Sequence, residues 1–365
     1  MRVFRIFHGG GVPAYQQRDA ELARLGHQVT LVVPRWFREL PEITVAEKRD
    51  DEITVLPVGL YGPRRNPFYF YNPLEIAKVL SDFRPDIIDI HEEPYSLAAF
   101  SALLARMLVR SKAEVVFRSS QNVYKKYPFP FSWIQRAVFR SSSAAYVPSA
   151  QAKAVLERKG YAAPVSVIGN GVDFRTPPTE PEHRNSRQLE VLYVGRLIER
   201  KGVLDLVEAA IPLGDLIHVT FVGSGPLQSQ IQTMISRASS RFTTVGAVPH
   251  EEVADFMERA DVICVPSHEL DGWSEQFSRA LVEGMASSCV PVVSTSGALP
   301  DVSGGIRTPI PWGDAEALST ELRDLATLES LEELKEAARQ HALSNYSWSA
   351  TSSRLSEIYE GVARV

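Results

Sequence analysis

The chain is poor in the features that mark secreted, membrane-spanning and nucleic-acid-binding proteins. Its 365 residues include only two cysteines, Cys264 and Cys289. Both lie in apolar runs, which excludes a disulfide framework and predicts buried, reduced thiols. No run of about 18 apolar residues is present, and the apolar run at the N-terminus is too short for a signal peptide. A net charge of −5 gives no general case for nucleic-acid binding. We therefore expect a cytoplasmic protein.

The rest of the composition is that of a globular protein. Hydrophobic residues make up 44% of the chain and charged residues 23%, and the length favours two domains over one. A polar, proline-rich segment, 176–187, has no periodicity and is typical of an interdomain linker. We place the domains at 1–174 and 175–345, and expect a final helix of about 346–365 to pack back on the first domain.

Short apolar runs alternate with amphipathic segments in both halves, as in parallel strands joined by crossover helices. The strands expected first are 3–7, 29–33, 86–90, 113–117, 144–147 and 165–168, with helices at 17–25, 75–83, 97–109 and 150–159. After the linker, the expected strands are 189–194, 217–222, 242–245, 262–265 and 290–293. The sequence thus predicts an α/β protein with two Rossmann-like, doubly wound parallel sheets.

The loop after the first strand is rich in glycine. Backbone amides at Gly9, Gly10 and Gly11 are candidates for contact with a phosphate at a helix N-terminus. A merely tight turn explains the run equally well. The run is not Gly-x-Gly-x-x-Gly, which argues against the alternative of a nicotinamide-dependent oxidoreductase.

Basic residues follow the first strand of the second half. Gly195 begins a loop that opens a helix at Val203. Within it, Arg196 and Lys201 are expected to converge on one anion, and their guanidinium and ammonium groups both suit a diphosphate. Gly225 follows the next strand and is a candidate wall for the base or ribose.

Two carboxylates stand eight positions apart after strand 262–265. We expect Glu275 at a helix N-terminus and Glu283 within the helix, off its apolar stripe. Eight helical residues span about 12 Å, so one carboxylate would hold sugar hydroxyls and the other a ribose. Taken alone, two such residues are ordinary solvated charges.

A basic and aromatic stretch occupies 103–140 and includes Lys125 and Lys126. Such a surface suits an anionic or amphiphilic acceptor, or a layer of lipid headgroups. A basic face whose aromatic side chains are partly core is an equally good interpretation.

In this order, the segments resemble the family-4 (group 1) glycosyltransferases of the GT-B fold over nearly the whole chain. The matching segments are the glycine loop, 21–30, 84–91, 167–173, Gly195–Arg196 with Lys201–Gly202, and 275–283. The resemblance implies two Rossmann-like domains that face a cleft, with the C-terminal helix crossing back to the N-terminal domain.

The resemblance also implies a reaction. A sugar would pass from a nucleotide-sugar donor to a glycan, lipid-linked or small-molecule acceptor, with retention of configuration and without a metal or other cofactor. Arg196 and Lys201 would neutralise the leaving diphosphate, and Glu275 would hold hydroxyls of the donor sugar. These three residues would be the catalytic ones. Glu283 would bind the ribose. The further residues expected at the donor are Gly10, Gly11, Gly195, Gly225, Gln276, Phe277 and Ser278.

The acceptor side departs from the family pattern. Many members carry a histidine where this chain has 118–122. Gln121 and Asn122 can hydrogen-bond a sugar or phosphate but are not general acids or bases. The acceptor candidates are His91, Gln121, Asn122, Lys125 and Lys126, and peripheral association with the inner membrane face is a further expectation. A non-catalytic sugar-nucleotide-binding protein stays as the alternative.

Overall fold

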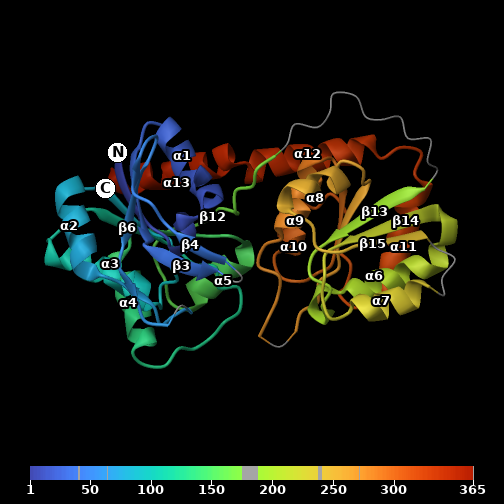
Figure 1. Ribbon diagram of the computed structural model, residues 1–365, viewed down its shortest axis with the longest axis horizontal. Helices are drawn as coiled ribbons and strands as arrows, with labels where there is room; N and C mark the ends of the chain where they lie inside the picture. Colours follow the sequence, from blue (N-terminus) through green and yellow to red (C-terminus); the bar gives the residue numbers. More distant parts are fainter. Residues whose placement is uncertain (40–41, 64, 175–187, 237–240, 271, 365) are drawn as a thin grey trace. The chain divides into compact units, whose positions relative to one another are not determined.

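The computed structural model describes residues 1–39, 42–63, 65–174, 188–236, 241–270 and 272–364. The chain forms two compact units. Unit 1 comprises Met1–Gly171 and Trp348–Val365, and unit 2 comprises Val172–Ser347. The sequence placed these boundaries at 174/175 and 345/346, and the predicted linker, 176–187, lies outside the described residues. Both units are α/β with parallel sheets, which confirms the predicted fold class (Figure 1).

Unit 1 contains an eight-stranded sheet in the order β12-β11-β10-β9-β1-β2-β6-β5. Its strands are β1 (Arg2–Ile6), β2 (Gln28–Pro34), β5 (Arg49–Asp50), β6 (Thr54–Val58), β9 (Ile87–Ile90), β10 (Glu114–Arg118), β11 (Ala144–Val147) and β12 (Val165–Val167). Only the pair of β5 and β6 is antiparallel among these described strands. Most are buried on both faces, which is why they could be predicted as apolar runs.

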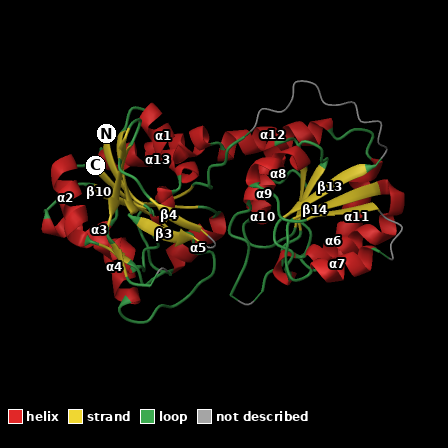
Figure 2. Cartoon of the chain, viewed as in Figure 1, coloured by secondary structure: helices red, strands yellow, loops and turns green. Residues whose placement is uncertain are grey.

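Helices cover both faces of this sheet (Figures 1 and 2). Strand residues alternate between two cores: Phe4 and Ile6 pack toward α2 to α5, whereas Val3 packs toward α1 and α13. The helices are α1 (Gln17–Arg24), α2 (Pro73–Phe83), α3 (Leu97–Leu108), α4 (Phe131–Ser141), α5 (Ala150–Arg158) and α13 (Trp348–Ala363). The last helix of the chain thus packs on the first domain, as predicted.

Some elements of unit 1 are absent from the sequence prediction. They are α4, the sheet strands β5 and β6, and two small antiparallel pairs, β3 (Trp36–Glu39) with β4 (Glu42–Val45), and β7 (Leu60–Tyr61) with β8 (Phe70–Tyr71). These strands have two to five residues, too few to show a period. They lie between β2 and α2 in the chain.

Unit 2 contains a five-stranded sheet in the order β15-β14-β13-β16-β17. Its strands are β13 (Leu189–Val194), β14 (Ile217–Val222), β15 (Arg241–Val245), β16 (Val262–Val265) and β17 (Val290–Val293). Its helices are α6 (Val203–Ala210), α7 (Gln228–Ile235), α8 (His250–Met257), α9 (Arg279–Ala286), α10 (Leu299–Val302), α11 (Ala315–Thr327) and α12 (Glu332–Tyr346). One core packs α6, α7 and α11 on the sheet, and the other packs α8, α9, α10 and α12 on its opposite face.

Each sheet has a point at which the chain reverses its direction of winding. In unit 2 the chain moves outward from β13 to β15 and then returns to place β16 on the other side of β13. In unit 1 it moves outward from β1 and returns to place β9 beside β1. Ligands of such sheets bind beyond the carboxyl ends of the strands at these switch points.

The cysteines and the apolar segments, both scarce in the sequence, have clear places in the structure. Cys264 and Cys289 are both buried, as predicted, and burial raises the pKa of the Cys264 thiol. In the part of the chain that the structure describes, no helix combines the length and the apolar character that crossing a bilayer requires.

Candidate active site

An ion pair spans the switch point of unit 2. Lys201 ends the short helix η3 (Glu199–Lys201) in the loop after β13, and Glu275 lies in the loop after β16. The Lys201 Nζ donates to Glu275 Oε2 at 2.5 Å, and Ser267 Oγ donates to the same oxygen at 2.9 Å. The Trp273 ring lies 5.5 Å from the ammonium. The structure thus brings together two of the three residues predicted to be catalytic.

Glycine holds these loops close together. At Gly202 φ is +63°, and a Cβ there would lie 1.8 Å from the carbonyl oxygen of Pro266, in the loop after β16. Only glycine allows this approach of one backbone to the other. The tight packing fixes the position of Lys201 relative to the loop that carries Glu275.

Glu275 is not at a helix N-terminus, contrary to the prediction. α9 begins at Arg279, and Ser278 caps it by accepting a hydrogen bond from the Leu281 amide at 3.3 Å. Phe277 packs against Tyr346, with ring centroids 5.5 Å apart, while Gln276 is exposed. The first four residues of the 275–283 segment are therefore a loop, and the 12 Å helical spacing does not apply.

Arg196 lies in the same loop as Lys201 and is exposed. Its carbonyl accepts a hydrogen bond from Tyr193 at 2.8 Å. Burial, followed by the charge of Glu275, raises the pKa of the Tyr193 hydroxyl, whereas Arg196 opposes this shift. Arg196 and Glu275 therefore both act electrostatically on one hydroxyl.

Gly195 and Gly225 shape the neighbouring loops. A Cβ on Gly225 would lie 2.3 Å from the carbonyl oxygen of Leu197, so the loops after β13 and β14 touch through their backbones. Gly195 begins the first of these loops. Their contact with a donor stays a prediction.

Glu283 has its own surroundings on α9. Its carboxylate lies 3.2 Å from the Arg279 guanidinium and 3.5 Å from His250 Nε2. Burial raises the pKa of Glu283, and Arg279 and His250 oppose that shift. Together with His250 and Asp173, Glu283 lines a cavity of about 200 Å³. A ribose contact at Glu283 stays a prediction.

The glycine loop of unit 1 is tightly packed. The loop forms the short helix η1 (His8–Gly11), in which the Gly10 amide donates to the Phe7 carbonyl at 3.2 Å. A Cβ on Gly10 would lie 3.0 Å from Leu31 and Val33 side chains. Packing therefore explains Gly10, and a phosphate contact at Gly10 or Gly11 stays a prediction.

Gln121 belongs to an internal network. Its amide nitrogen donates to Glu93 at 3.0 Å, and its oxygen accepts from Tyr127 at 3.1 Å and from Lys159. Asn122 is buried. Burial lowers the pKa of Lys159 to about 8. The structure gives Gln121 a positioning role in this loop, and an acceptor contact would have to compete with these bonds.

His91 lies within a buried network at the end of β9. Its Nδ1 is 2.9 Å from both an Arg5 nitrogen and the Tyr146 hydroxyl. Arg5 in turn binds Asp19 at 2.5 Å and Asp89 at 2.8 Å. Burial, followed by the charges of nearby arginines, lowers the pKa of His91 well below its ordinary value. The ring helps to support the sheet end.

A second pair across a switch point was not predicted. His8 follows β1 and Glu92 follows β9, and His8 Nδ1 lies 3.0 Å from Glu92 Oε2. Tyr69 and Tyr71 donate to the same carboxylate at 2.8 Å and 2.9 Å. The sequence does carry a signal, since each residue follows a predicted strand, but it does not show that those strands are neighbours.

The basic and aromatic stretch is partly core and partly surface. Lys125 and Lys126 are exposed. Phe129 is 81% exposed and Trp133 is 49% exposed. Phe131 instead packs on the core of unit 1. Both interpretations of the stretch therefore apply to different residues in it.

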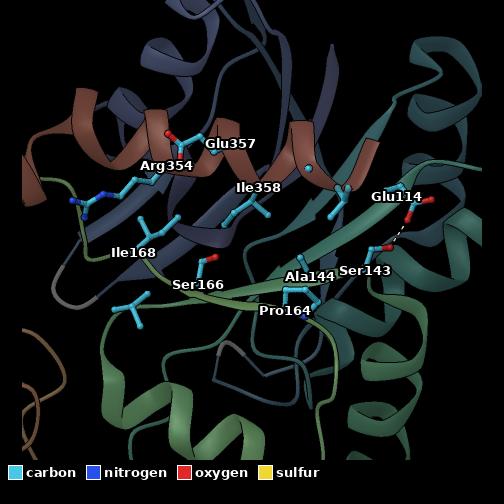
Figure 3. Close-up of a pocket in the computed structure, with 12 residues that line it drawn as sticks. Glu114, Ser143, Ala144, Pro164, Ser166, Ile168, Arg354, Glu357 and Ile358 are labelled. Atoms are coloured by element: carbon cyan, nitrogen blue, oxygen red, sulfur yellow. Dashed lines mark hydrogen bonds between the residues drawn. The ribbon is translucent and has the colours of Figure 1, made fainter. Parts of the chain in front are cut away.

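A cavity of about 960 Å³ lies elsewhere in unit 1 (Figure 3). It lies between α13, the first residues of β10 and β11, and the segment that contains β12, with Ala144 and Ile358 in its wall. Ligand sites of open parallel sheets lie at the carboxyl ends instead. The described residues that line it include none of the predicted site residues, and we assign it no part in the chemistry.

Comparison with known proteins agrees with this arrangement. The family described as "Glycosyltransferase Family 4" matches residues 19–175, and "Glycosyl transferases group 1" matches residues 188–327. The amylovoran biosynthesis glycosyltransferase AmsK of Erwinia amylovora is 32% identical over 95% of this chain and 84% of its own. The phosphatidyl-myo-inositol mannosyltransferase of Mycobacterium leprae is 31% identical over 54% of this chain and 53% of its own length.

A solved structure shares the fold. Anabaena HepE, crystallised with UDP, superposes with a TM-score of 0.70 at 16% identity and covers 99% of this chain and 100% of its own. Sequence matches on both sides of the predicted linker, with a relative similar over nearly the full length, identify the family. The chain belongs to the family-4, group 1 glycosyltransferases of the GT-B fold.

Proposed function

We propose that this glycosyltransferase moves a hexose from a nucleotide-sugar donor to a glycan acceptor, with retention of configuration and without a metal. The Lys201–Glu275 pair supports this most directly, because it places a cation and a carboxylate together at a switch point. The ammonium suits a diphosphate, and the carboxylate suits sugar hydroxyls. When the donor binds, Lys201 would contact the diphosphate and Glu275 would contact the sugar, and their ion pair would be broken.

The names of the relatives support a first choice of donor and acceptor. HepE was crystallised with UDP and with UDP-glucose, so UDP-hexoses are the first donors to test. AmsK is named for amylovoran biosynthesis, which favours a growing polysaccharide as the acceptor. Negative charge grows on the diphosphate as the bond to the sugar breaks, and Arg196 and Lys201 would stabilise it there.

Retention can be tested without knowing the acceptor. The protein is incubated with an α-linked UDP-hexose in water, and the first sugar released is followed by proton NMR before it mutarotates. We expect the α-anomer. The β-anomer as first product would contradict retention, and saturable donor binding without release of nucleotide would favour the non-catalytic alternative.

Turnover is expected to persist in chelator. The reason is that Arg196 and Lys201 supply the positive charge that a divalent ion supplies in other transferases. The rate of nucleotide release is measured with saturating EDTA and then with added magnesium or manganese. A rate abolished by EDTA and restored by either metal would show that these two cations do not neutralise the diphosphate.

We further propose that the basic surface at Lys125 and Lys126 meets an anionic or lipid-linked acceptor at the membrane face. Acceptor use should then weaken steeply with salt, since charges more than about 8 Å apart are screened at physiological ionic strength. The double charge reversal Lys125→Glu with Lys126→Glu should raise KM for the acceptor and leave donor binding unchanged. Lys48→Glu with Arg241→Glu, at exposed positions outside the stretch, is the control. Unchanged acceptor kinetics in the first variant would remove this role.

A further inference from the structure

We infer that Arg18 and Arg118 bind a phosphate monoester in unit 1, and that this phosphate is carried by the acceptor sugar. The second part rests on the proposed function, since it concerns the acceptor of that reaction. Arg118 is the last residue of β10, and Arg18 lies in the first turn of α1. Both stand at the carboxyl edge of the sheet, where ligands of open α/β sheets bind.

The two guanidinium groups converge on one short segment after β12. Arg18 Nη2 donates to the Gly169 carbonyl at 3.3 Å. Arg118 Nη2 donates to Asn170 Oδ1, on the next residue, at 2.6 Å. Tyr146 is a neighbour of both, because its ring centre lies 5.9 Å from the Arg18 guanidinium and it pairs in register with Arg118. The fold therefore gathers two cations at one place.

Neither cation has a carboxylate partner. Among the residues that the structure describes, no acid forms an ion pair with either arginine, although Arg18 is only 4% exposed. Asp19 and Asp89 are both bound to Arg5. Glu93 instead accepts hydrogen bonds from the loop after β10. Burying a guanidinium without a counter-ion is costly, and a bound anion would supply the missing charge.

Hydrogen-bond donors without acceptors mark the same place. The Nε atoms of Arg18 and Arg118 are buried and have no hydrogen-bond partner, and the same holds for Trp348 Nε1. The Trp348 ring centre lies 5.8 Å from the Arg18 guanidinium. All three groups can only donate, whereas a phosphate offers three strong acceptor oxygens. The chemistry of the orphaned atoms thus matches that of the ligand.

The positive charges also disfavour each other in the free protein. Burial, followed by the charge of Arg18, lowers the pKa of Arg118 to about 10. Arg18 stands in the first turn of α1, where the helix dipole disfavours a cation. A phosphate monoester, with a charge of about −1.5 to −2 at pH 7, would relieve both effects. Arg118, Ser120 and Asn170 are half-buried, so solvent reaches the site.

Calorimetric titration with glucose 1-phosphate is the first test, and it needs neither a donor nor turnover. Arg118→Gln should weaken binding about ten- to a hundredfold, the usual cost of one charge-assisted hydrogen bond. Arg106→Gln is the matched control and should bind as the parent does, because Arg106 is also half-buried and bonds a backbone carbonyl, but at the amino end of β10. Parental affinity in Arg118→Gln would overturn the inference. So would loss of binding in Lys201→Met, which would place the phosphate in unit 2.

Thermal unfolding separates binding from a structural role. In phosphate-free buffer Arg118→Gln should melt no lower than the parent, because it removes an unpaired buried charge. Glucose 1-phosphate at a hundredfold excess over Kd should raise the melting temperature of the parent by about 5 to 10 °C, and that of the variant about half as much or less. Arg118→Lys keeps the charge and should fall between them. A lower melting temperature in Arg118→Gln with an undiminished ligand shift would mean that this side chain only holds the segment after β12, and would overturn the inference.

Transfer kinetics test whether the phosphate belongs to the acceptor. With a UDP-hexose as donor, Arg118→Gln should raise KM for glucose 1-phosphate about ten- to a hundredfold and leave KM for methyl glucoside unchanged. Inorganic phosphate that binds the parent as tightly as glucose 1-phosphate, or glucuronate that binds it more tightly, would overturn the assignment to a phosphorylated acceptor. Phosphate binding without any glycosyl transfer would instead contradict the proposed function and leave the phosphate site standing.

Discussion

Replacing Lys201 with methionine is expected to lower the turnover number about a hundred- to a thousandfold. The ammonium lies at the switch point of unit 2 and would stabilise charge on the departing diphosphate, and loss of one such group typically has this cost. Methionine keeps much of the side-chain volume against Trp273 and removes the charge. The measurement is the rate of nucleotide release at saturating UDP-hexose.

The chain offers a close control for that variant. Lys335 pairs with Asp261 at 2.7 Å and is 21% exposed, as Lys201 is. Asp261 precedes β16 and so lies at the amino end of the sheet, away from ligands. Lys335→Met should therefore leave the rate nearly unchanged. Equal losses in both variants would mean that Lys201 acts through stability alone.

The two carboxylates of unit 2 should respond differently to substitution. Glu275→Gln is expected to slow turnover about ten- to a hundredfold, because its charge-assisted bonds to the sugar, of about 1.5 to 3 kcal/mol, tighten as positive charge builds at the anomeric carbon. Glu283→Gln should instead raise KM for the donor, since ribose geometry hardly changes during the reaction.

Titration of UDP, which lacks the hexose, separates these roles. Glu283→Gln should weaken UDP binding. Glu275→Gln should not, because the Lys201 ammonium, freed from its ion pair, still faces the diphosphate. Equal weakening in both variants would contradict the division into a sugar carboxylate and a ribose carboxylate.

The main parallel strands could be predicted because burial on both faces leaves a simple apolar run. The start of α9 could not, since Phe277 continues the helical spacing of Leu281 and Met285. Phe277 is apolar for another reason: it packs on Tyr346 from the loop. A loop residue with a core contact is indistinguishable from a helical one by spacing.

The contacts of the switch-point residues were more predictable in unit 2 than in unit 1. Arg196, Lys201 and Glu275 stand in loops with recognisable spacing. His8 and Glu92 are 84 residues apart, and their contact depends on β1 and β9 being neighbours. That order follows from how the whole chain packs, which strand patterns alone do not reveal. Likewise, the internal bonds of Gln121 depend on Glu93, from a different strand end.

We expect unit 2 to hold a nucleotide sugar between its switch-point loops. The most direct test is calorimetric titration of the protein with a panel of UDP-, GDP- and ADP-hexoses, with NAD as a negative control, followed by assay of each solution for released nucleotide. We predict saturable binding of one class of nucleotide sugar, slow release of its nucleotide, and loss of that release in Lys201→Met but not in Lys335→Met. Absence of binding across the panel, or release that Lys201→Met leaves intact, would contradict the account.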